Sequence, residues 1–110
     1  MSNAPTTPDE VRQLVDGAIS SIAGADLVAK IAPLLRTATQ QKLHWEYGDN
    51  EPFDAWRFAD LGGGIWAAYC TGGHGALGCP WGLVSANSDL FGMDCGWYRE
   101  LHQLFEDWFA

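Results

Sequence analysis

The chain has 110 residues, of which 47% are hydrophobic and 18% are charged, and its formal net charge is -8 at pH 7. This length predicts one compact domain, and the hydrophobic content excludes a chain that is disordered throughout. No apolar run reaches the ~18 residues of a membrane-spanning helix, and the acidic balance argues against binding to nucleic acid or to an anionic membrane.

The first predicted element is an amphipathic helix over residues 8–23. Thr7 is a typical N-cap residue, Pro8 takes the first helical position, and Glu10 stands where a capping box requires it. Apolar residues then recur at helical spacing until Gly24. They are Val11, Leu14, Val15, Ala18, Ile19 and Ile22. We expect residues 1–6, which precede this helix, to be flexible.

A second and shorter helix is predicted over residues 27–37, with Asp26 as its cap. Pro33 has no backbone N–H to donate, so we expect this helix to be kinked or split near Pro33.

After Gln40 the hydrophobic period changes from 3.6 to 2, which predicts strands. Leu43, Trp45 and Tyr47 alternate with polar residues, as in a half-buried strand. Three glycines at 62–64 predict a hairpin turn. The predicted strands cover residues 42–47, 53–61, 65–70 and 81–85, and a last helical stripe covers residues 97–109.

In this order the elements predict an α+β fold. It has two N-terminal helices, about four antiparallel strands in one sheet, and a C-terminal helix packed on the sheet. No repeat or linker divides the chain, so residues 1–110 are expected to form a single domain. The expected core residues are Leu14, Ile19, Ile22, Trp66, Leu83, Leu101, Leu104 and Phe105.

The three cysteines and one histidine raise two chemical alternatives. Three thiolates and an imidazole can hold tetrahedral zinc, but the spacing of Cys70, His74, Cys79 and Cys95 lacks the paired C-x2-C motif. A thiol activated by histidine would make a small enzyme. Both remain alternatives, and no cofactor or metal is expected. The odd cysteine count and the polar N-terminus predict a reducing cytoplasm.

The acidic, aromatic-rich composition favours a protein-binding function. Six Trp, three Tyr and five Phe all lie between Trp45 and Phe109, and Trp and Tyr dominate interface hot spots. We expect a non-enzymatic module for a basic partner, such as an immunity-type toxin inhibitor or an effector chaperone, and a homodimer remains open. The expected binding face surrounds the 48–54 turn and the 71–80 loop, with Trp45, Asp49, Glu51, Asp54, Trp56 and Trp81.

Overall fold

The sheet of this protein has five antiparallel strands in the order β1-β2-β3-β4-β5. The computed structural model describes residues 4–92 and 94–110. Its strands are β1 (Leu35–His44), β2 (Pro52–Gly62), β3 (Ile65–Tyr69), β4 (Trp81–Ser85) and β5 (Trp97–Tyr98), and its helices are α1 (Pro8–Ser20), α2 (Ala25–Ile31) and α3 (Leu101–Trp108). The α+β prediction is confirmed, including the C-terminal helix packed on the sheet.

Helix α1 begins where the sequence predicts, because Thr7 caps it. The Glu10 backbone N–H donates to Thr7 Oγ1 (3.2 Å). The Glu10 carboxylate accepts from the backbone N–H of Thr6 (3.1 Å), one residue earlier than a capping box would have it. The hydrogen bonds that the Glu10 carboxylate accepts lower its pKa from the usual value, most of all the one from the Thr6 hydroxyl (2.7 Å). Residues 1–3 of the segment expected to be flexible lie outside the described residues.

The second helix is shorter than predicted, and the first strand is longer. Helix α2 ends at Ile31, and a single 3-10 turn over Ala32–Leu34 leads into β1 at Leu35. The prediction of helix for residues 35–37 is therefore wrong, since Pro33 ends the helix instead of kinking it. Trp45 and Tyr47 in turn lie beyond the end of β1.

The C-terminal helix also begins later than predicted. Trp97 belongs to β5, which pairs with β4, and α3 starts only at Leu101. The side chain of Glu100 accepts from the first turn of α3, while the Glu100 backbone N–H donates to Gln103 Oε1 (3.0 Å). This reciprocal capping box fixes the start of the helix.

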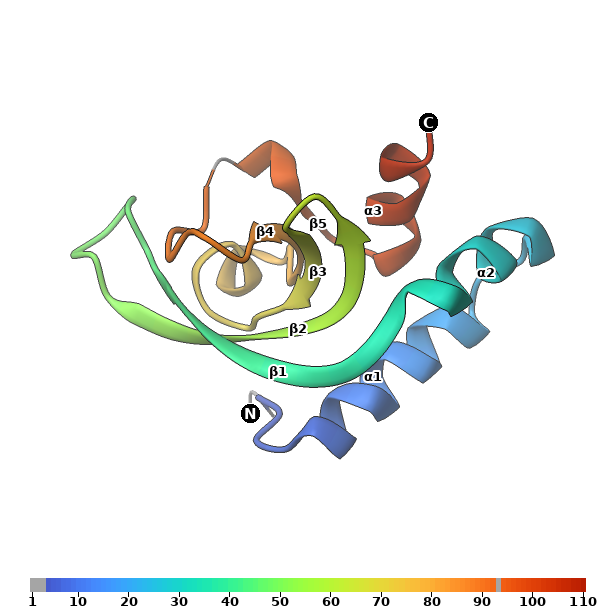
Figure 1. Ribbon diagram of the computed structural model, residues 1–110. Coiled ribbons are helices and arrows are strands. Elements are labelled where there is room, and N and C mark those ends of the chain that lie inside the picture. Colours follow the sequence, from blue (N-terminus) through green and yellow to red (C-terminus); the bar gives the residue numbers. More distant parts are fainter. Residues whose placement is uncertain (1–3, 93) are drawn as a thin grey trace.

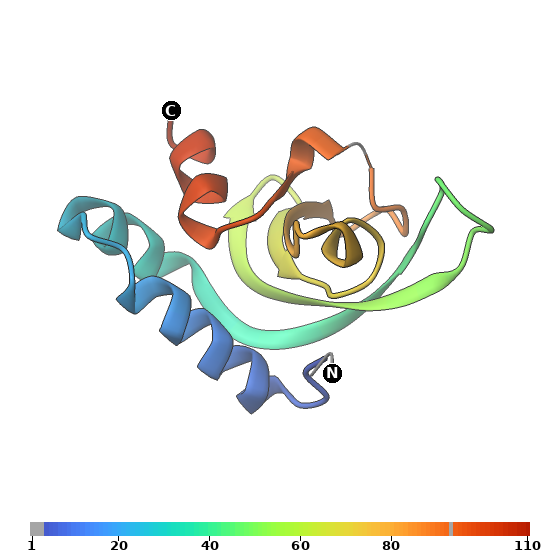
Figure 2. The ribbon, with the colours of Figure 1, turned by 180° about the vertical axis from the view of Figure 1, so that it is seen from behind.

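The sheet is strongly curled and separates two cores. Figures 1 and 2 show the helices outside the curl and the segment between β3 and β4 within it. The outer core joins the helices to the convex face through Val11, Val15, Ile31, Ala38, Trp56, Phe58, Ala59, Ala67, Trp81, Leu101, Leu104 and Phe105. The inner core fills the concave side with Leu43, Ala55, Ala68, Cys70, Val84, Phe91 and Trp97.

Most of the predicted core residues contribute to one of these cores. Leu101, Leu104 and Phe105 are fully buried, and the half-buried Ile19, Ile22, Trp66 and Leu83 pack against a core. Leu14 is the exception, with 38% of its surface exposed, because Val11 and Val15 carry the buried side of α1. No helix among residues 4–92 and 94–110 is long and apolar enough to cross a membrane.

We predict that Leu104→Ala destabilises the protein by about 2–5 kcal/mol, because Leu104 is fully buried between α3 and the sheet. Leu14→Ala is the matched control on α1, and we expect it to cost less than ~1 kcal/mol. Urea unfolding of both variants measures the difference. Equal losses in the two variants would contradict the packing of α3 described above.

Candidate functional site

The tip of the β1–β2 hairpin forms a projecting, acidic end of the molecule. In Figures 1 and 2 this tip lies far from α2 and α3. Trp45 N–H donates to Glu51 O (2.9 Å), and Gly48 N–H donates to Trp45 O (3.3 Å). A Cβ at Gly48 would lie only 2.7 Å from the Trp45 ring, so this turn requires glycine. Asn50 adopts a positive φ of 57°, which its short polar side chain tolerates.

The segment after β4 supports the hairpin tip from one side. His44 N–H donates to Asp89 O (2.6 Å), and Phe91 N–H donates to His44 O (3.4 Å), which makes a parallel bridge between His44 and Leu90. Gly92 N–H donates to the Glu46 carboxylate (2.8 Å). These bonds hold the hairpin and residues 89–92 together as one surface.

An aromatic cluster lies beneath this surface, with His74 at its centre. The ring of His74 meets that of Trp45 edge to face at 4.7 Å and that of Tyr47 at 5.9 Å, and it lies 5.8 Å from the Trp97 ring. His74 is only 5% exposed, and its Nε2 donates to Gly92 O (3.2 Å). His74 therefore serves to position aromatic rings, because its Nε2 proton is committed to a backbone carbonyl.

The exposed part of this region combines apolar and acidic side chains. Tyr47 is 60% exposed and Leu90 is 43% exposed. We call the region the hairpin face and define it by Trp45, Glu46, Tyr47, Asp49, Glu51 and Leu90. Trp45, Asp49 and Glu51 are among the residues predicted from the sequence, whereas Glu46, Tyr47 and Leu90 are not. Tyr47 continues the alternating pattern of a strand, which predicts a buried side chain at that position instead of an exposed one.

The other predicted binding residues lie outside the hairpin face. Trp56 and Trp81 are 5% and 7% exposed and belong to the outer core, where the Trp81 ring packs edge to face on Phe58 and Tyr69. Their aromatic surface is already used within the fold. Asp54 lies on the arm of the hairpin, and its carboxylate pairs with Lys42 Nζ at 3.4 Å.

The cysteine and histidine residues of the alternative zinc site do not come together as a set of metal ligands. Among the side chains described by the structure, no three from His, Cys, Asp or Glu are placed to hold a metal ion. Cys70 Sγ faces the carbonyl of Asp54 at 3.5 Å, whereas His74 bonds to Gly92 O and Cys95 is exposed. Burial raises the pKa of Cys70 to about 11, so this thiol stays protonated at neutral pH and is a poor nucleophile.

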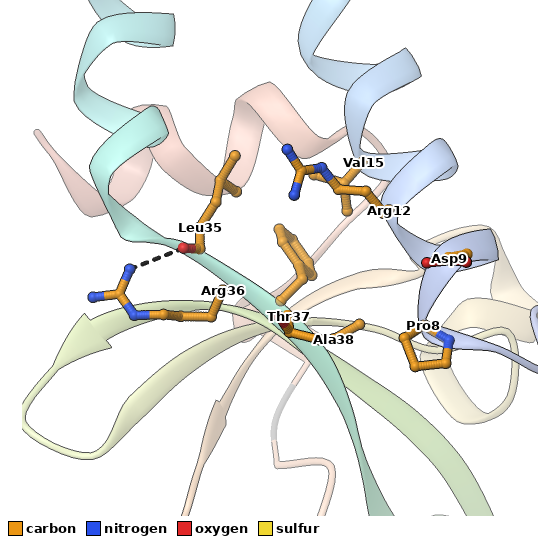
Figure 3. A pocket seen from close by; sticks show the side chains of 9 residues that line it. Pro8, Asp9, Arg12, Val15, Leu35, Arg36, Thr37 and Ala38 are labelled. Carbon is orange, nitrogen blue, oxygen red and sulfur yellow. Dashed lines mark hydrogen bonds between the residues drawn. The ribbon is translucent and has the colours of Figure 1, made fainter.

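A small pocket lies away from the hairpin tip, where α1 meets the start of β1 (Figure 3). Its volume is about 110 Å³. The two arginines beside it are held by nearby groups of the chain, since Arg12 Nε donates to Asp16 (2.9 Å) and Arg36 donates to the carbonyls of Pro33 and Leu35. The apolar part of the lining comes from Pro8, Val15, Leu35, Ala38 and Phe58.

Comparisons of this chain with protein-family models, with curated proteins and with solved structures found no match. Any assignment of function therefore depends on the arrangement of its own residues.

We predict that the three thiols react in the order of their exposure. Cys95 is exposed and should be alkylated by iodoacetamide first, whereas Cys70 is buried, with its pKa raised to about 11 by desolvation. At pH 8 only about one Cys70 in a thousand is a thiolate, so it should react last. Mass spectrometry of timed samples measures the order, and Cys70→Ser should remove only the slowest step. Alkylation of Cys70 as fast as Cys95 would contradict this burial.

Proposed function

We propose that this chain is a non-enzymatic module that binds a basic protein partner through the hairpin face. The observation that carries the proposal is the exposed ring of Tyr47, which contacts Trp45 and His74 edge to face and stands among carboxylates. A ring that is already fixed by its neighbours loses little conformational entropy when a partner covers it. Tyrosine is also among the residues that most often dominate binding energy.

The charge of the hairpin supports a basic partner. Residues 43–54 carry four carboxylates and no Lys or Arg. Glu46 accepts from Gly92 N–H and Asp54 pairs with Lys42, whereas Asp49 and Glu51 are exposed at the tip. The net charge of -8 adds a long-range field that speeds encounter with a cationic protein.

A suitable partner carries lysine or arginine around an apolar patch that receives Tyr47 and Leu90. Immunity-type inhibitors of basic toxins and chaperones of secreted effectors both need such an acidic face, and both remain within the proposal. Pairing with a second copy of this chain is less favourable, since two chains of charge -8 repel each other.

We predict that Tyr47→Ala weakens partner binding by about thirtyfold, the size of an interface anchor worth about 2 kcal/mol.

The charge variant Asp49→Asn/Glu51→Gln should mainly slow association with the partner and reduce the salt dependence of the association rate. Its matched control is Asp26→Asn/Glu106→Gln, which removes two exposed carboxylates from α2 and α3. The partner is isolated from the native lysate at low salt and is then purified for binding kinetics.

The control variant should bind this purified partner as the wild type does. The proposal fails if the hairpin and control variants lose binding equally, if the captured protein is acidic, or if nothing is captured at either low or high salt.

A further inference from the structure

A polar cleft lies where the curl of the sheet closes. Gln41 on β1 donates through Nε2 to the carbonyls of Ser85 (3.0 Å) and Ser88 (2.7 Å), which draws the segment after β4 toward β1. The cleft beside these bonds has a volume of about 510 Å³. Its lining consists of Gln40, Gln41, Lys42, Arg57, Ala86, Asn87, Ser88 and Asp89.

Two buried polar atoms at this cleft have no hydrogen-bond partner among the described residues. They are the acceptor Gln41 Oε1 and the donor Arg57 Nε. The orientation of the Gln41 amide is fixed, because two carbonyls accept from its nitrogen and would repel its oxygen. Buried polar groups left unpaired are costly. Both atoms are closed to solvent in this structure, so a ligand that supplies a donor and an acceptor pairs with them once the side chains that cover them move aside, and this pairing would stabilise the cleft.

Arg57 has the features of an anion-binding side chain. Its guanidinium lies 4.9 Å from the centre of the Trp66 ring, which holds it by a cation–π contact. Among the side chains that the structure describes, no carboxylate lies within ion-pair distance of Arg57. The planar guanidinium donates in a fork that matches the two oxygens of a carboxylate.

The register of β1 and β2 places these two groups within reach of one small molecule. Arg57 lies opposite Thr39, and Gln41 lies two residues further along β1 on the same side of the strand. Long side chains at such diagonal positions approach one another. A ligand with a carboxylate and an adjacent donor can therefore contact both.

We propose that this cleft binds a small carboxylate that carries an amino or hydroxyl group on the adjacent carbon. The carboxylate accepts from Arg57, and the amino or hydroxyl group donates to Gln41 Oε1. Lys42 lies on the rim, but its Nζ already pairs with Asp54 at 3.4 Å, so Arg57 supplies the charge that holds the ligand.

The test is a titration of ¹⁵N-labelled protein with four probes: lactate, glycine, acetate and glycerol. The resonances to follow are the side-chain amide of Gln41 and the indole N–H of Trp66. We expect lactate or glycine to shift both resonances with saturation, acetate to bind at least fivefold more weakly, and glycerol to cause no shift. Whichever of lactate and glycine binds more tightly identifies the donor as a hydroxyl or an amino group.

Arg57→Gln should weaken ligand binding at least tenfold. The matched control is Arg36→Gln, which removes the same charge from a guanidinium that donates to backbone carbonyls outside the cleft, and it should leave ligand binding unchanged. Arg57→Lys keeps the charge without the fork, so it provides a folded variant with intermediate binding if Arg57→Gln unfolds. The proposal is overturned if neither lactate nor glycine gives saturable shifts, if glycerol shifts the resonances as lactate does, or if both Arg57 variants bind like the wild type.

Discussion

The curl of the sheet depends on irregular pairing of β2 with β3, whose register shifts twice, at 57–59 and at 60–62, and the first shift bears on both proposed sites. Arg57 lies opposite Ala68, but Ala59 lies opposite Ala67, so β2 has one residue more than its partner in this stretch. Such a bulge bends a strand and increases its twist. Here it allows both Phe58 and Ala59 to pack in the outer core with the helices, while Arg57 remains on the concave side.

This bend determines where the protein can present a binding surface. The helices cover the convex face, and Phe91 and Trp97 fill much of the concave face, with the Trp97 ring so close to Gly82 that a Cβ there would collide with it. The hairpin tip and the cleft at Arg57 both lie where the segment after β4 meets β1. Both are bordered by residues 86–92, so one irregular segment supports the hairpin face and one wall of the cleft.

The sequence predicts the fold better than the site, for identifiable reasons. Local signals such as the Thr7 cap and the glycines at 62–64, which all adopt positive φ, depend only on neighbouring residues. Trp97 fits the helical spacing of Leu101, although the two side chains belong to different cores, and spacing alone cannot separate them. The hairpin face and the cleft both require contacts between β1 and residues more than 40 positions later, which no local pattern reveals.

Native-state hydrogen exchange at His44 and Phe91 is the most direct test of the closed curl on which both proposed sites depend. Each amide is bonded across the gap between β1 and the 89–91 segment, and the Trp97 indole N–H donates to Phe91 O (2.9 Å) inside it. If the curl is closed, these three protons exchange slowly and together. Rapid exchange of all three, while the amides between β2 and β3 stay protected, would contradict the account.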